Sequence, residues 1–135
     1  MAEGEARDTV PDPRDADQLI ADFAGRVPGV LRAAVVAGDG VLVAVSDRTR
    51  PDQLKQLSAI TAGLIGLAGA AARILDDDVT QALVTMAGGT LVIMSIDQGS
   101  SLAVLTTASA DLDTIAYEMT MLVEQAGSIF TPPAR

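Results

Sequence analysis

The feature that most constrains the fold is an uncharged stretch of sixteen residues, LSAITAGLIGLAGAAA, between Lys55 and Arg73. At 1.5 Å per residue, a helix of this length spans roughly 24 Å, whereas the hydrocarbon core of a bilayer requires about 30 Å. The stretch is also rich in alanine and glycine, which gain little free energy from membrane insertion. It therefore predicts a helix covered by protein, with no direct membrane insertion.

Three glycines within this stretch, Gly63, Gly66 and Gly69, each cost about 0.5 to 1 kcal/mol relative to alanine in a helix interior. Their presence calls for a compensating contact, and small residues allow another helix backbone to approach closely. A second set of residues forms a stripe suited to packing on a sheet, with Ile60 and Ile65 pointing elsewhere. The stripe comprises Leu54, Leu57, Leu64, Leu67, Ala68, Ala71 and Leu75. Homodimerisation through the helix over residues 54–75 is the simplest hypothesis.

Hydrophobic periodicity and turn residues divide the rest of the chain into the order α-β-β-α-β-β-β-α. The residues from Leu91 to Met94 are apolar without alternation, so both faces of the sheet should be covered. This predicts an α/β (α+β) sandwich, with a five-stranded antiparallel sheet and helices on both faces. The helices are expected at about 15–27, 54–75 and from 111, and the strands at 30–38, 41–47, 79–87, 90–97 and 101–107.

Polar residues mark the ends of these elements. Asp15 or Asp17 is expected to cap the first helix and Asp111 the last, which Gly127 should end. Asp39-Gly40 is the dipeptide best suited to a type I′ hairpin turn.

The chain is predicted to contain one folded domain, residues 15–130. Residues 1–14 combine charge and proline with few apolar residues, which predicts a disordered acidic tail. Residues 131–135 contain two prolines and are expected to be flexible.

Little in the sequence suggests chemistry. The chain has no cysteine and no histidine, which excludes thiolate, histidine-based and Cys/His zinc sites. Asp76, Asp77 and Asp78 lack the interleaved spacing of a calcium loop, so a solvated turn is expected there. We therefore expect no catalysis, no cofactor and no metal.

Charge argues against nucleic acid as a partner. The net charge is −9, and the nearest approach to a basic patch is Arg48, Arg50 and Lys55, expected to lie on a solvated loop and helix start. The acidic N-terminus does not match a secretory signal, so the cytoplasm is the expected compartment.

Four segments in this order resemble the Roadblock (dynein light chain) family, and most closely the small Roadblock proteins of actinobacterial conservon operons. They are RVPGVLRAAVVAGDGVLVAVS, LKQLSAITAGLIGLAGAAARIL, VTQALVTMAGGTLVIMSI and SLAVLTTASADLDTIAYEMTMLVEQAG. The resemblance covers about residues 19–130 and implies the same α-β-β-α-β-β-β-α fold.

The resemblance also implies a function. Family dimers join edge strands and place their middle helices side by side, which here implicates residues 79–87 and 54–75. The dimers serve as platforms for Ras-like small GTPases, and conservon members associate with a histidine-kinase-like membrane protein, which could recruit this protein to the inner face of the membrane. The residues expected at the dimer contact are Leu57, Ala59, Ile60, Thr61, Gly63, Leu64 and Gly66.

Other functions remain open at this stage. A small-ligand sensor of PAS or GAF type would also mix a sheet with helices, and would require a concave pocket. An enzyme using only Asp, Glu and Ser would require a perturbed carboxylate pair in a cleft. A purely structural dimerisation module is the third alternative.

Overall fold

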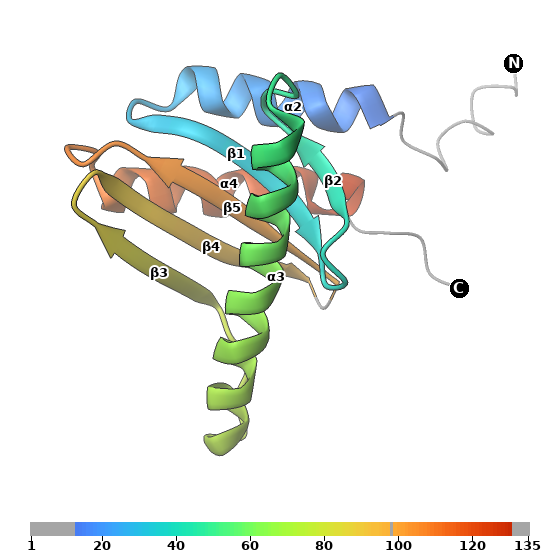
Figure 1. The fold of residues 1–135 in the computed structure, drawn as a ribbon, viewed down its shortest axis with the longest axis vertical. Helices are drawn as coiled ribbons and strands as arrows, with labels where there is room; N and C mark the ends of the chain where they lie inside the picture. Colours follow the sequence, from blue (N-terminus) through green and yellow to red (C-terminus); the bar gives the residue numbers. More distant parts are fainter. Residues whose placement is uncertain (1–12, 98, 131–135) are drawn as a thin grey trace, which may run out of the picture.

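The computed structural model describes residues 13–97 and 99–130, which form three helices and five strands in the order α-β-β-α-β-β-β-α (Figure 1). This order confirms the sequence prediction. The elements are α2 (Pro13–Arg26), β1 (Val30–Ala37), β2 (Leu42–Val45), α3 (Pro51–Ile74), β3 (Gln81–Met86), β4 (Gly89–Asp97), β5 (Ser100–Thr106) and α4 (Leu112–Phe130). The predicted tails, residues 1–12 and 131–135, lie outside the described residues.

The five strands form one sheet in the order β2-β1-β5-β4-β3, with every neighbouring pair antiparallel. The first hairpin, β1-β2, thus pairs through β1 with the last strand, β5. This arrangement leaves β2 and β3 as the two edges of the sheet.

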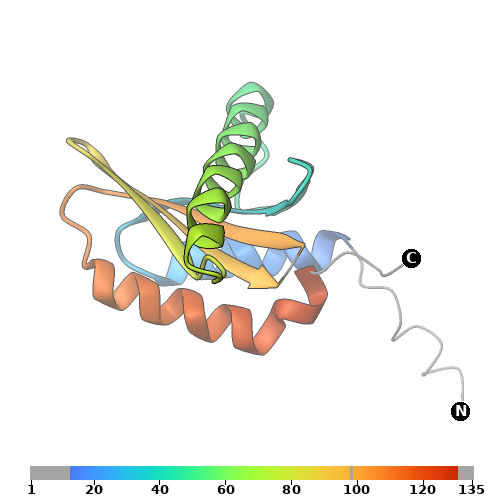
Figure 2. The ribbon, with the colours of Figure 1, turned by 90° about the horizontal axis from the view of Figure 1, so that it is seen from below.

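Helices cover both faces of the sheet, as the apolar run in β4 predicts. Figure 2 shows α3 on one face and α2 with α4 on the other. Adjacent residues of β4 belong to the two cores: Val92 packs on the side of α2 and α4 with Phe23 and Ile115, whereas Ile93 packs under α3 with Leu57. All five are buried, so the sheet is the middle layer of a three-layer sandwich.

The β1-β2 turn differs from the type I′ prediction. Gly40 has a φ of +89°, but Asp39 does not have the positive φ that a type I′ turn requires. The N–H of Ala37 donates to the carbonyl of Val41 at 2.8 Å, which closes a three-residue loop. A left-handed glycine at the third loop position is typical of such loops, so Gly38 is a loop residue that the dipeptide rule did not count.

The helix ends were predicted with mixed success. The carboxylate of Asp111 accepts hydrogen bonds from the N–H groups of Asp113 and Thr114 at 3.1 and 3.2 Å, which confirms the cap of α4. However, α4 continues through Gly127 to Phe130, which is only 1% exposed. Burying a phenylalanine contributes about 1.5 to 3 kcal/mol, more than a helical glycine costs.

The central helix, α3, is longer than the sheet that it crosses. Its 24 residues span about 36 Å, whereas five strands are about 19 Å across. Only the first half of α3 therefore packs on the sheet, through Leu54, Leu57 and Thr61, while Leu67 and Leu75 of the expected stripe are exposed. Ile65, expected to point elsewhere, packs against the core beneath α3.

The length of α3 also differs from the expectation about membrane insertion. The sixteen uncharged residues are too short to span a bilayer, but by length and composition alone the whole of α3 could cross a membrane. The topology argues against a crossing, because β2 precedes α3, β3 follows it, and both belong to one sheet. A membrane-spanning α3 would place these two strands on opposite sides of the bilayer.

Candidate functional site

A surface groove of about 780 Å³ lies between α3 and the β1-β2 turn. Asp39, Pro51 and Lys55 in its lining are exposed, and the hydroxyl of buried Ser58 donates to the carbonyl of Leu54 at 2.9 Å. The groove thus presents neither the enclosed cavity nor the free buried polar group that a small-ligand sensor requires.

No group of three or more carboxylates suited to hold a metal ion occurs among the described residues. Asp76, Asp77 and Asp78 are exposed at the end of α3, as a solvated turn requires. Asp76 has a φ of +53°, its N–H donates to the carbonyl of Arg73 at 3.2 Å, and the N–H of Asp77 donates to that of Ala72 at 3.0 Å. These contacts form a Schellman motif, so the acidic run is a helix end.

The most distinctive surface lies along the open edge of the sheet at β3. Every second residue of an edge strand turns its N–H and C=O away from its only neighbour, here β4. Within residues 13–97 and 99–130, no side chain hydrogen-bonds to the backbone of β3. Leu83 and Met86 are 46% and 47% exposed on this strand, so both backbone and side chains are available for pairing.

An apolar side of α3 continues this surface. The opposite side of the helix carries Lys55 and Ala59, which line the groove against the β1-β2 turn. Ile60, Leu64 and Leu67 share the side away from that groove, because they follow each other at helical spacing. Figure 1 shows β3 on this side of α3, opposite to β2. Ile60 and Leu67 are 50% and 73% exposed. Together β3 and this side of α3, residues Ile60, Leu64, Leu67 and Ala71, form what we term the β3–α3 surface.

The structure distributes the seven residues predicted at a dimer contact over four sides of α3. Leu57 and Thr61 are buried against the chain's own sheet, which leaves no area for a partner. Ala59 and Gly66 lie on the side of the β1-β2 turn, while Ile60 and Leu64 face β3 and Gly63 lies between the two sides on the outer surface. The sequence pattern alone could not separate these sides because nearly all of these residues are apolar or small.

The glycines of α3 have no close neighbour in the protomer. A Cβ added at Gly63, Gly66 or Gly69 would meet no atom within 4 Å. The compensating contact that these glycines suggest is therefore absent from the described part of the chain.

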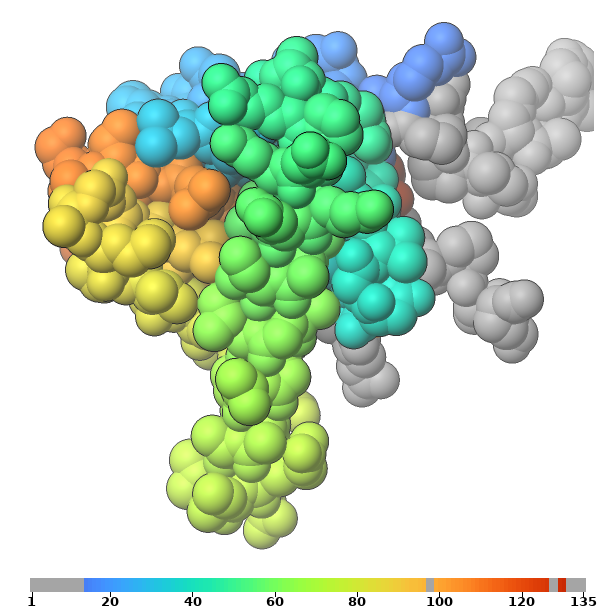
Figure 3. Space-filling model, viewed as in Figure 1, coloured from blue at the N-terminus to red at the C-terminus, as the bar shows by residue number. Residues whose placement is uncertain are grey.

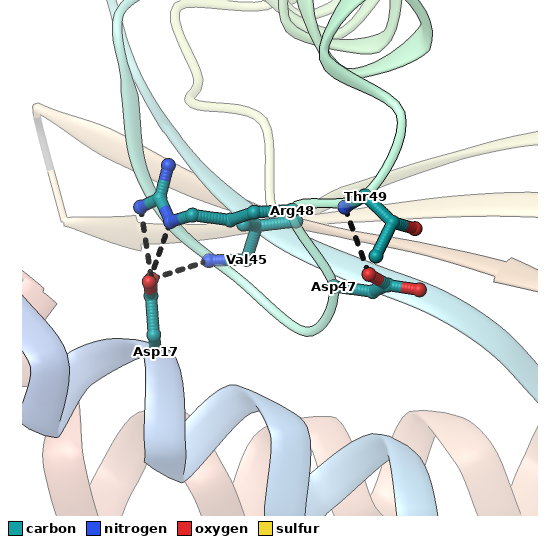
Figure 4. A network of polar contacts seen from close by, with 5 residues as sticks. All are labelled: Asp17, Val45, Asp47, Arg48 and Thr49. Atoms are coloured by element: carbon teal, nitrogen blue, oxygen red, sulfur yellow. Dashed lines mark hydrogen bonds and ion pairs between the residues drawn. The ribbon is translucent and has the colours of Figure 1, made fainter.

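The other edge of the sheet, at β2, is closed by a side chain (Figure 4). The carboxylate of Asp17 accepts a hydrogen bond from the N–H of Val45 at 3.0 Å, and from Nε and Nη2 of Arg48 at 2.6 and 3.0 Å. The hydrogen bonds that Arg48 donates to Asp17 also raise the pKa of Arg48. Asp15 or Asp17 was expected to cap the first helix, but α2 begins earlier, at Pro13, which suits a first helical turn.

A second carboxylate shapes the same loop. Asp47 accepts a hydrogen bond from the N–H of Thr49 at 2.9 Å, and hydrogen bonds from the side chain and backbone of Thr49 lower the pKa of Asp47. Sequence analysis missed this role and that of Asp17. The Asp-x-Thr spacing could have indicated the local turn, but no pattern links Asp17 to a strand twenty-eight residues away.

The model of the Roadblock/LC7 domain family matches residues 11–106, which is most of the chain. The chain belongs to the Roadblock/LC7 domain family. No protein of curated function matches the sequence.

Solved structures agree with this assignment. One Roadblock/LC7 domain from Streptomyces avermitilis is 32% identical over 83% of this chain and 94% of its own, with a TM-score of 0.77. A second from that organism is 34% identical over 81% and 95%, with a TM-score of 0.68. MglB from Myxococcus xanthus shares the Roadblock fold, with a TM-score of 0.79 over 88% and 90% of the two chains, at 14% identity.

Proposed function

We propose that this Roadblock protein is a non-enzymatic homodimer that binds and regulates a Ras-like small GTPase in a membrane-associated signalling complex. The observation that carries the proposal is the β3–α3 surface. It combines an open strand edge with an exposed apolar helix side, whereas the opposite edge of the same sheet is closed by Asp17.

Two copies would cover this surface if β3 of one protomer pairs with β3 of the other. Strand pairing satisfies backbone groups that an open edge leaves to water, and it continues the sheet from one protomer into the next. A two-fold axis at the new strand pair also brings the two α3 helices to the same face of the joined sheet. The exposed Ile60 and Leu67 then gain an apolar neighbour.

The GTPase partner is supported by family membership and by the resemblance to conservon Roadblock proteins. The identity to the Streptomyces domains supports an actinobacterial setting. A solved MglB structure with a tetrameric arrangement, 16% identical to this chain, supports self-association on the same fold. We place the dimer in the cytoplasm, brought to the membrane by a partner such as a histidine-kinase-like protein.

A purely structural dimerisation module is the alternative. It would form the same dimer, but the dimer would have no partner whose binding depends on guanine nucleotide.

Two measurements test the proposal. Sedimentation equilibrium at micromolar concentration should give twice the mass of the chain, and a monomer would reject the dimer. The tagged dimer should then capture a small GTPase from lysate differently in GDP and in a non-hydrolysable GTP analogue, and change the GTP hydrolysis rate of the purified GTPase. Capture that is independent of nucleotide, with no effect on hydrolysis, would favour the structural module.

A further inference from the structure

A lysine without a partner lies in the groove between α3 and the β1-β2 turn. Figure 3 shows this turn, in teal, beside α3, in green. Lys55 is exposed in the lining of the groove and is the only lysine of the chain. Its ammonium group makes no hydrogen bond or ion pair with any residue that the structure describes. The same lining includes the buried Leu54 and the half-buried Leu42, so the groove combines a cation with apolar side chains.

Two arginines extend the basic charge along the loop between β2 and α3. Arg48 and Arg50 lie in this loop, and Arg48 also lines the groove. With Lys55, they place three of the nine basic residues of the chain within eight positions. The groove and its loop are therefore a local gathering of positive charge on a chain whose net charge is −9.

The aspartates of this region already have partners. Asp17 binds Arg48, and Asp52 lies in the first turn of α3, where the helix dipole is positive. Asp39 and Asp47 each accept a hydrogen bond from the backbone N–H group two residues further on, at 3.1 and 2.9 Å. The lysine in the groove is left without a carboxylate, so the groove can accept one from another segment.

The acidic segment, residues 1–12 (MAEGEARDTVPD), precedes α2 and carries the complementary charge. It contains four acids against one base, Arg7. The acids are Glu3, Glu5, Asp8 and Asp12. Ala6 and Val10 lie between them, so the segment offers apolar side chains as well as carboxylates.

The acidic segment joins the fold next to the groove. A second hollow, of about 480 Å³, is lined by Arg14 at the start of α2 and by Arg48, which also borders the groove. Twelve extended residues reach about 40 Å, so their length does not limit the contact. Tethering also gives the segment an effective concentration in about the millimolar range. The chain's own segment is thus favoured over an acidic peptide from solution.

We infer that the acidic segment docks in the groove of its own chain, with a carboxylate on Lys55 and apolar residues against Leu42 and Leu54. The groove lies on the side of α3 opposite to the β3–α3 surface, so the contact leaves that surface open and forms in a monomer and in a dimer alike. A partner that approaches the groove side of α3 has to displace the segment. The acidic segment therefore controls access to this side of the helix.

Paramagnetic relaxation enhancement tests the contact in the full chain. Because the chain has no cysteine, Gly4→Cys places a single nitroxide label in the acidic segment. The amide signals of Gly40, Lys55 and Ala59 in the groove lining should be lost, whereas Glu118 should keep its signal. Glu118 binds the last residue of α2, at the end far from the segment. At about 1 M NaCl the lost signals should return, because screening then acts over about 3 Å.

The matched control keeps the label and removes three charges through Glu3→Gln, Glu5→Gln and Asp8→Asn. Its groove signals should persist. Equal losses with and without these charges would show a segment that only moves near the groove, and would overturn the inference. Groove signals that persist in the chain with its natural charges would overturn it as well.

A mixed sample identifies whose groove is occupied. Chains that carry the nitroxide but no ¹⁵N are combined with ¹⁵N-labelled chains that carry no nitroxide, and subunits are allowed to exchange. We expect the groove signals of the ¹⁵N-labelled chains to persist. Loss of these signals would show docking on a second copy and would overturn docking within one chain.

Discussion

The two edges of the sheet differ in how their backbone groups are treated. At β2, a strand of four residues, Asp17 binds the N–H of Val45 and Arg48. At β3, a strand of six residues, Leu83 and Met86 are exposed, and the structure places no side chain of the described residues on its backbone. Closed edges prevent strand pairing and open edges invite it.

In the proposed dimer, this difference decides which edge of the sheet pairs with a second copy. A sheet with two open edges could add copies at both sides and grow into a filament, whereas one open edge related by a two-fold axis closes after two copies. In the proposed dimer, the hydrogen bond from the N–H of Val45 to Asp17 is thus an element of assembly as well as of stability. The variants that follow alter residues at or away from the two edges, in order of decreasing expected effect.

Leu67→Glu should weaken dimerisation through the open β3 edge. Leu67 is 73% exposed in the protomer, so the fold should be retained. Losing about 1.5 kcal/mol of burial in each of two symmetric copies amounts to about 3 kcal/mol, or roughly a 100-fold weaker dimer. Sedimentation equilibrium measures the dissociation constant. Lys55→Glu on the opposite side of α3 is the control, and an equal effect of both variants would contradict the assigned side.

Asp17→Ala should open the closed edge. The N–H of Val45 loses its acceptor, which should lower the free energy of unfolding by about 1 to 2 kcal/mol. The freed β2 edge should also produce species larger than a dimer as the concentration rises. Chemical denaturation and sedimentation velocity report the two effects. The control is Asp22→Ala, whose carboxylate accepts a hydrogen bond from exposed Gln18 in the same helix at 2.8 Å. Matching results for both variants would show that Asp17 does not block strand pairing at β2.

Arg48→Ala should have a smaller effect than Asp17→Ala. The Arg48 side chain is 53% exposed, and exposed ion pairs contribute roughly 0 to 1 kcal/mol. Asp17 can still accept from Val45 in this variant, so the edge should remain closed and the protein dimeric. Denaturation of both single variants and the double variant gives the coupling between the residues. Larger assemblies in Arg48→Ala alone would show that the ion pair, rather than the backbone contact, blocks β2.

The smallest effect should come from Asp111, which caps α4 away from both edges. Hydrogen bonds from the backbone and side chain of Thr114 lower the pKa of Asp111. Since its folded pKa is the lower one, its charge stabilises the fold above the ordinary aspartate pKa of about 4, and this contribution disappears as pH falls through the folded pKa. Thermal midpoints of wild type and Asp111→Asn should therefore differ at pH 7 and converge in acid, with Asp113→Asn as control. A difference that persists in acid, or a changed dimer constant, would contradict this assignment.

Much of the fold follows from local patterns. The uninterrupted apolar run in β4 indicated a sheet covered on both faces, and the structure confirms two cores that divide Val92 from Ile93. Asp111 was identified as a cap because capping depends on residues within one turn. The turn at Asp39 was placed correctly but typed wrongly, since loop length depends on where β1 and β2 pair.

The candidate site was less predictable. The long helix was identified, but Leu57 and Thr61 face its own sheet while Ile60 faces β3, a distinction that composition cannot make among apolar residues. Asp17 was considered only as one of two candidates for a helix cap, because its partner, the N–H of Val45, is remote in sequence.

The stretch from Leu57 to Ala72 specified by itself a long apolar helix whose glycines lower the stability of the helix when it is isolated. Periodicity and turn residues likewise specified the order of strands and helices, because these signals act over a few residues. Only the tertiary structure decided which edge of the sheet is closed, which side of α3 remains exposed, and that this helix extends beyond its sheet. Those properties depend on strand order and on the ratio of helix length to sheet width, which arise when distant segments meet.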